Sequence, residues 1–176
     1  MCMNKKKSAF IFLLTIISFI LCIGLFSFNE FAASQDVTND ITIASWNLKN
    51  FGLAKLNDES RINIIVNVIK KYDIVAIQEV QDSTLSLPVE LIKKINEGGG
   101  NYKAVMSERI GRGTKEQYLF VYDDDVIDFI QNTTGYGIEP NDEFAREPFY
   151  AMFRAGKFDF YLMTIHTAPG EVATEI

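Results

Sequence analysis

Cysteine and histidine are nearly absent from this 176-residue chain. Its only cysteines, Cys2 and Cys22, lie in the first 34 residues, and its only histidine is His166. The rest of the chain therefore forms no disulfide and must be stabilised by its hydrophobic core. Beyond the N-terminal block there is no internal repeat and no low-complexity segment, so one domain of ordinary size is expected.

Positive charge is also scarce. The chain has 17 basic and 23 acidic side chains, a net charge of −6. Residues 1–34 hold three lysines and Glu30, so without them 14 basic and 22 acidic side chains remain, a net charge of −8. An acidic surface argues against loose, charge-driven binding to nucleic acid. It does not exclude an enzyme that holds a few phosphates locally with the help of a divalent metal ion.

The N-terminal block has the pattern of a targeting segment. The basic run Lys5–Lys7 precedes an uncharged, apolar stretch over residues 9–28, and small residues follow it. This order is typical of a secretory signal, with cleavage expected near residues 33–35. The stretch is also long enough to span a bilayer, with the lysines in the cytoplasm. Residues 1–34 are thus expected to be a signal peptide or a membrane anchor. Residues 35–176 would be exported, either secreted or anchored at the outer face of the cytoplasmic membrane.

The chain after the leader has the order of a mixed α/β fold. Apolar, β-branched runs predict strands at residues 41–46 and 74–78, and a helix is predicted between them over residues 59–71, behind a cap at Asp58. A second helix is predicted over residues 88–96. Five further strands are predicted at residues 102–107, 117–122, 126–130, 149–154 and 158–165. Strand, helix and strand in succession indicate a layered α/β unit, whose ligands gather beyond the C-terminal ends of the strands.

Polar clusters follow several of these strands. A loop is predicted over residues 47–52, Glu79 ends the next strand, and His166 ends the last one; two more polar clusters lie at residues 112–118 and 144–148. Each has a plain structural interpretation, Glu79 as a hydrated carboxylate and His166 as a hydrogen-bonded histidine at a strand end. Histidine is, however, the side chain whose ordinary pKa lies near neutrality, which suits a catalytic acid or base.

Several runs, in this order, resemble the deoxyribonuclease I branch of the endonuclease/exonuclease/phosphatase superfamily. They are Asn47 after a strand, Ile77–Val80, Lys115–Phe120, Phe144–Pro148 and Ile165–Pro169, continued by Glu171–Ile176. The Trp-Asn-Leu and Gln-Glu elements are shared across the superfamily, whereas Lys-Glu-Gln-Tyr and Arg-Glu-Pro point to this branch. The resemblance covers about residues 41–176 and implies a two-sheet α/β sandwich that hydrolyses phosphodiesters with a divalent metal ion.

The resemblance implies a role for each matched residue. Glu79 would bind the metal, with Asn47 beside it on the metal or on a phosphate oxygen. His166 would act as a general acid or base, oriented by Glu116. Arg146 would bind phosphate, for which its guanidinium is suited. The implied metal is Mg²⁺, with Ca²⁺ or Mn²⁺ as alternatives, and the implied substrate is double-stranded DNA.

Other positions are less specific to the family. Lys49 and Arg112 would contact the DNA backbone, although either could be a solvated charge. Gln81 stands where the family commonly has an arginine that enters the minor groove, so the contact with DNA is expected to differ. Glu116 could instead be a carboxylate in an exposed turn, and Arg146 a structural ion-pair partner of Glu147 or a neighbour.

The resemblance also implies what this chain does not contain. Family members have a later Gly-Asp-Phe-Asn element and a second histidine with its aspartate partner, and neither occurs in this sequence. Residues 35–176 are therefore expected to be the N-terminal part of the domain, truncated after its first half. They would be a fragment, the product of an interrupted gene or one piece of a split protein, for which the missing C-terminal half is a candidate partner. The inner face of Ile74–Ile77 is expected to be exposed, and the fragment to be weak or inactive. The alternatives are another superfamily phosphohydrolase, such as a sphingomyelinase, or a non-catalytic remnant or binding protein.

Overall fold

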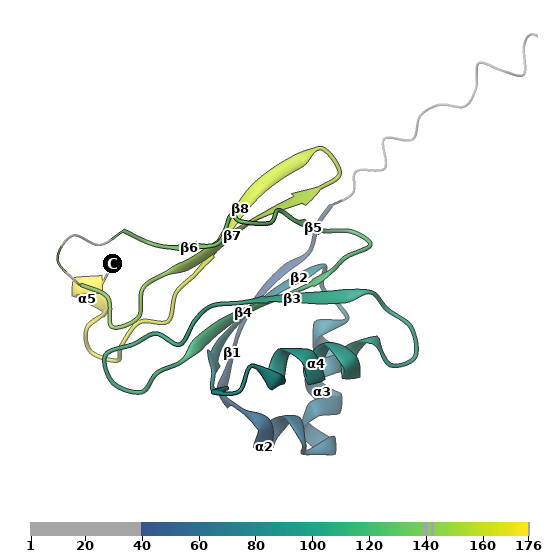
Figure 1. Ribbon diagram of the computed structural model, residues 1–176, viewed down its shortest axis with the longest axis horizontal. Helices are drawn as coiled ribbons and strands as arrows, with labels where there is room; N and C mark the ends of the chain where they lie inside the picture. The colour runs from purple at the N-terminus through teal and green to yellow at the C-terminus, as the bar shows by residue number, and fades with distance from the viewer. Residues whose placement is uncertain (1–39, 139–140, 142, 176) are drawn as a thin grey trace, which may run out of the picture. The chain divides into compact units, whose positions relative to one another are not determined.

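The computed structural model describes residues 40–138, 141 and 143–175 of the chain. From Asn39 onward the chain forms one compact unit (Figure 1). The predicted leader over residues 1–34 lies outside the described residues. Within the part that is described, no helix is long and apolar enough to cross a membrane.

The first sheet has four strands in the order β1-β2-β4-β3. Their bounds are Ile43–Phe51 for β1, Ile74–Val80 for β2, Tyr102–Met106 for β3 and Gln117–Asp123 for β4. β1 and β2 run parallel, and β4 is antiparallel to both β2 and β3. β2 and β4 are buried almost throughout, because the sheet is covered on both of its faces.

Three helices cover one face of this sheet. They are α2 (Leu53–Leu56), α3 (Glu59–Ile69) and α4 (Ser86–Asn96), and Figure 1 shows them on the side turned away from β7 and β8. The predicted cap of α3 is confirmed, since the Asp58 carboxylate accepts hydrogen bonds from the N–H groups of Ser60 and Arg61. The helices and the sheet share one hydrophobic core.

The second sheet is centred on β7 (Phe149–Ala155). β8 (Phe158–Thr164) pairs with one side of β7, and the short strands β5 (Asp128–Phe129) and β6 (Gly135–Tyr136) pair with the other; all are antiparallel to β7. Gly156 lies in the β7–β8 turn with φ of 58°, which fits the predicted hairpin. A four-residue helix, α5 (Val172–Glu175), follows β8.

The two sheets pack face to face around an aromatic core. Phe120 of β4 stacks on Phe149 at a ring distance of 5.5 Å and meets Phe153 edge-on at 5.6 Å. Ile74 is fully buried in the same cluster. The expectation that the inner face of Ile74–Ile77 would be exposed is therefore wrong, because β7 and its neighbours already cover it. The predicted two-sheet α/β sandwich is confirmed.

The predicted loop over residues 47–52 is also wrong in its boundaries. β1 continues through these residues to Phe51, which is fully buried. The strand can carry the polar sequence because its pairing with β2 is irregular there. That irregularity shapes the candidate site.

Candidate active site

Two irregular stretches of backbone meet at the ends of β1 and β2. The register of the β1–β2 pair shifts after Asn47, and that of the β2–β4 pair shifts after Ile77. Within these stretches, Lys49, Asn50 and Glu79 have φ of 48°, 55° and 59°. Non-glycine residues rarely adopt this left-handed region, and such strain is concentrated at functional sites. The surrounding sheet must therefore hold this edge in place.

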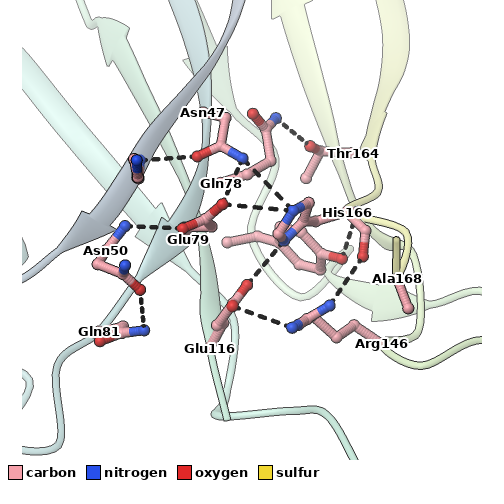
Figure 2. A network of polar contacts seen from close by, with 12 residues as sticks. Asn47, Asn50, Gln78, Glu79, Gln81, Glu116, Arg146, Thr164, His166 and Ala168 are labelled. Atoms are coloured by element: carbon pink, nitrogen blue, oxygen red, sulfur yellow. Dashed lines mark hydrogen bonds and ion pairs between the residues drawn. The ribbon is translucent and has the colours of Figure 1, made fainter. Parts of the chain in front are cut away.

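The irregularity in β2 aims two neighbouring side chains at the end of β8. In a regular strand, Gln78 and Glu79 would point to opposite faces. Instead, Gln78 Nε2 donates to Thr164 Oγ1 at 2.7 Å, and Glu79 Oε1 lies 3.5 Å from His166 Nε2 (Figure 2). The left-handed backbone at Glu79 breaks the alternation and brings its carboxylate to the histidine.

The Glu79 carboxylate is held by two donors from β1. Its Oε1 accepts from Asn47 Nδ2 at 2.7 Å, and its Oε2 accepts from the N–H of Asn50 at 2.9 Å. Burial acts to raise the pKa of Glu79, but these hydrogen bonds and the nearby His166 and Arg146 hold it below its ordinary value. Glu79 is therefore an anion at neutral pH.

His166 is bound on its other side by an ion pair of the buried Glu116 and the partly buried Arg146. Its Nδ1 lies 2.9 Å from Glu116 Oε2, and Arg146 Nη2 lies 3.1 Å from Glu116 Oε1. Arg146 Nη1 also donates to the carbonyl of His166 at 3.4 Å. Because an ionised carboxylate only accepts, Nδ1 carries the proton, and Nε2 faces Glu79 and Asn47.

The structure brings together Asn47, Glu79, Glu116, Arg146 and His166, from five separate parts of the sequence (Figure 2). The Arg146 guanidinium forms an ion pair with Glu116, 30 residues away in the sequence, and its phosphate-binding role stays a prediction.

Lys49 and Arg112 lie outside this network of side-chain contacts. The N–H of Lys49 donates to Asn47 Oδ1 at 2.8 Å, while its side chain is exposed. Arg112 Nη2 donates to the carbonyl of Phe144 at 2.9 Å, in a hollow also lined by Arg109 and Lys115. Neither contact tests the predicted role in binding DNA.

Sequence reasoning missed three contacts that shape the site. Gln78 joins Thr164, Tyr118 accepts from the N–H of His166, and Glu175 accepts from two loops. The period-two pattern could have found Tyr118, since it lies on the same face of its strand as Glu116. Nothing local in the sequence marks Glu175.

The sequence profile of the Endonuclease/Exonuclease/phosphatase family matches residues 44–170, which include every site residue expected from the sequence, from Asn47 to His166. The sandwich and the cluster at its strand ends are thus those of a known class of proteins. This chain belongs to the endonuclease/exonuclease/phosphatase family, and within it to the deoxyribonuclease I-like members.

The relatives that define this branch are deoxyribonucleases. Deoxyribonuclease-1 of Sus scrofa is 37% identical over 144 residues, which cover 77% of this chain and 51% of the relative. Deoxyribonuclease-1 of Oryctolagus cuniculus is 36% identical, covering 82% and 54%. Human deoxyribonuclease gamma is 34% identical, covering 76% and 47%. The chain therefore spans about half the length of the curated relatives it matches.

Solved structures show the same fold at low sequence identity. Humanized D. rerio TDP2 superposes with a TM-score of 0.51 at 15% identity, covering 76% of this chain and 51% of that one. The human Nocturnin catalytic domain, solved with a sulfate anion, gives 0.51 at 12% identity, covering 74% and 52%. These similarities support the sandwich architecture alone.

Proposed function

We propose that this chain is the N-terminal part of an exported, divalent-metal-dependent endonuclease that hydrolyses the phosphodiester bonds of DNA. The observation that carries the proposal is the juxtaposition of an anionic Glu79 with the His166–Glu116 pair. The relatives at 34–37% identity are named as deoxyribonucleases, which supports DNA as the substrate.

Glu79 fits one hard divalent cation. Each of its carboxylate oxygens accepts one hydrogen bond, and an ionised carboxylate has about four acceptor positions, so lone pairs remain free. Among the described residues, no group of three or more His, Cys, Asp or Glu side chains could hold a metal ion together. One carboxylate with several waters is the arrangement that suits Mg²⁺; Ca²⁺ or Mn²⁺ are the alternatives. When bound, the cation would offset negative charge on the phosphate.

Asn47 is placed to bind a phosphate oxygen through its Nδ2, while one lone pair of its Oδ1 remains for the metal ion. Its Oδ1 accepts from the N–H of Lys49, so its Nδ2 is turned toward Glu79 and His166. An amide N–H₂ group donates to phosphate oxygens and does not bind cations.

His166 is placed to move a proton at its Nε2. Glu116 accepts from Nδ1 and so orients the ring, which leaves Nε2 free to take a proton from water or return it to a leaving oxygen. Arg146 holds Glu116 and would add positive charge beside the phosphate. Lys49 and Arg112 would contact more distant phosphates of the duplex.

The second half of the fold is expected to complete this site. Among the described residues β8 is an edge strand that pairs with β7 alone, and Phe158, Tyr161 and Met163 on it are each at least 60% exposed. An exposed apolar edge strand is suited to accept another strand. A C-terminal half, on the same chain or separate, would supply that strand and a second histidine.

Export is the remaining part of the proposal. It is supported by the basic and apolar pattern of residues 1–34. Cell fractionation with N-terminal sequencing would distinguish a cleaved signal, which gives a new N-terminus at residues 33–35, from an anchor, which keeps the whole chain in the membrane fraction. Recovery of the uncut chain in the cytoplasm would contradict export.

Metal binding can be tested without activity, because the chain has only one histidine. Mn²⁺ bound at Glu79 should broaden the imidazole Cε1–H NMR line of His166, since Glu79 Oε1 lies 3.5 Å from Nε2. Glu79→Gln should abolish the broadening, whereas Glu90→Gln, which alters an exposed carboxyl on α4, should not. Equal broadening in all three proteins would overturn the metal site.

Catalysis is tested by nicking of supercoiled plasmid DNA with Mg²⁺. The 176-residue chain should nick weakly or not at all, and a chain extended by the second half of the domain should nick readily. Glu79→Gln and His166→Gln should abolish that activity, with Glu90→Gln as the control. Full activity in either site variant would contradict the assignment, and cleavage of sphingomyelin in preference to DNA would favour the other superfamily activity.

A further inference from the structure

We propose that Tyr118 and Glu175 are positioning residues, which together fix the segment of residues 165–168 that carries His166. The inference rests on the proposed function, because its consequence is the placement of the imidazole beside Glu79. It rests geometrically on two buried acceptors that bind the backbone N–H groups of His166 and Ala168.

Tyr118 binds the backbone of His166, and Glu116 binds the ring of the same residue. The Tyr118 hydroxyl accepts from the N–H of His166 at 2.8 Å, and only 1% of Tyr118 is exposed. Burial raises the pKa of Tyr118 to about 12, so the hydroxyl stays neutral. Glu116 and Tyr118, two residues apart, therefore contact the ring and the main chain of one histidine.

Glu175 joins the two loops that carry His166 and Arg146. Its Oε2 accepts from the N–H of Ala168 at 3.1 Å, and its Oε1 accepts from the N–H of Ala145 at 3.2 Å. The residue is 3% exposed. Ala168 follows His166 by two positions and Ala145 directly precedes Arg146, so one buried carboxylate fixes the spacing of both functional side chains.

These contacts explain how an irregular segment keeps its shape after β8 ends. Beyond Thr164 the ladder with β7 stops, so the N–H groups of His166 and Ala168 need other acceptors. Tyr118 and Glu175 provide them. Without these acceptors the segment would relax, and the imidazole would move away from Glu79 and Glu116; misplacement of a catalytic group by about 1 Å can lower a rate about a hundredfold.

The test of Tyr118 is the Tyr118→Phe variant, which removes only the hydroxyl. Backbone amide hydrogen exchange at His166 should become about five- to tenfold faster, as expected for the loss of one hydrogen bond. Tyr122→Phe is the matched control, because Tyr122 is buried in the same core four residues further along β4, about 13 Å away. In the control, exchange at His166 should be unchanged.

The test of Glu175 compares two substitutions. Glu175→Ala should speed amide exchange at both Ala145 and Ala168. Glu175→Gln should restore much of the protection at Ala145, because its amide oxygen can still accept where Oε1 does. Equal effects of the two substitutions, or unchanged exchange in both, would overturn the role of Glu175.

The Mn²⁺-broadened line of His166 separates positioning from general stability. In Tyr118→Phe and Glu175→Gln, bound Mn²⁺ should broaden the line less than in the unsubstituted chain. The affinity of Tyr118→Phe for Mn²⁺ and its melting temperature should stay close to those of the control, Tyr122→Phe.

Kinetics of the extended, active chain provide a second measurement. Both Tyr118→Phe and Glu175→Gln should lower kcat about tenfold or more and leave KM little changed. Unaltered broadening and exchange in Tyr118→Phe would overturn the inference. Absence of broadening in the unsubstituted chain would instead count against the metal site, and the exchange data would still decide the role of Tyr118.

Discussion

The two sheets of the sandwich differ in how much of their surface is covered. β2 and β4 are buried along almost their whole length, between the helices and the second sheet. In the second sheet, Phe149 and Phe153 are buried, while Tyr161 and Met163 are exposed on β8. Hydrophobic burial provides most of the stability of a fold, so the first sheet is expected to be the more stable part.

The residues of the candidate site are divided between the two sheets. Glu79 lies near the end of β2 and Glu116 precedes β4, whereas His166 follows β8 and Arg146 precedes β7. The proposed metal-binding carboxylate therefore belongs to the well-covered sheet and the histidine to the less covered one. Trp46, the only tryptophan, lies in β1, so tryptophan fluorescence and the single histidine resonance report the two sheets separately.

The largest loss of stability is expected from Phe120→Ala, because Phe120 lies at the contact between the sheets. Phe120 is fully buried against Phe149 and Phe153, and such a truncation costs about 3–5 kcal/mol. Denaturant unfolding should be followed by Trp46 fluorescence and by the His166 resonance. The histidine should lose its native signal at lower denaturant than the tryptophan. Coincident transitions would mean that the sheets unfold as one unit, which would remove the proposed difference.

The second largest loss of stability is expected from Asp82→Ala. Asp82 lies between β2 of the first sheet and α4. Its carboxylate accepts from the N–H groups of Leu87 and Thr84, each at 2.8 Å, and so caps α4. Removing a cap of this kind costs about 1–2 kcal/mol. The loss should appear in the Trp46 transition.

The cost of Asp82→Ala should also depend on pH. Burial acts to raise the pKa of Asp82, but the hydrogen bonds from Leu87 and Thr84 outweigh it and hold the pKa below its ordinary value. A lowered pKa in the folded state stabilises the fold above the ordinary carboxyl range of about 4, and this contribution is lost as the pH falls through the lowered pKa. The difference between the two proteins should therefore shrink in acid. A difference that stays constant from pH 7 to pH 3 would contradict this.

A smaller effect is expected from Thr164→Val, which tests the polar contact between the sheets. Thr164 Oγ1 accepts from Gln78 Nε2, which also donates to Ser45 Oγ at 3.0 Å, so the amide keeps a partner in the variant. The cost should be about 1 kcal/mol. It should appear mainly at the His166 resonance, since Thr164 precedes that histidine by two residues. An equal shift in the Trp46 transition would show that this contact does not distinguish the sheets.

The sequence predicted best those elements whose signals are local. The α3 helix and β2 were predicted because an Asp58 cap and a continuous apolar run suffice to identify them. The two-residue strands β5 and β6 were extended too far or missed, because pairing with β7 and not their own composition defines them. The closure of the core around Ile74 was missed for the same reason.

In the candidate site, too, features that depend on tertiary contacts were not predicted from the sequence. Family resemblance selected Glu79, Glu116 and His166, and these side chains do meet. The left-handed backbone at Glu79 could not be predicted, because it arises from the register shift between β2 and β4. Glu175 could not be predicted either, since it joins Ala168, seven residues before it, to Ala145, which lies 30 residues away in another loop.

The smallest change in stability is expected from Tyr161→Ser on the outer face of β8. This variant tests most directly whether the second sheet is less covered than the first. Tyr161 is 62% exposed, and its ring contacts Tyr150 at 5.8 Å. A substitution at an exposed position usually changes stability by less than about 0.5 kcal/mol, so neither unfolding transition should move measurably. A loss of about 2 kcal/mol or more would mean that a further segment or another copy of the chain covers this face in solution. The second sheet would then be as well covered as the first, and the expected early loss of the His166 signal in Phe120→Ala would disappear with it.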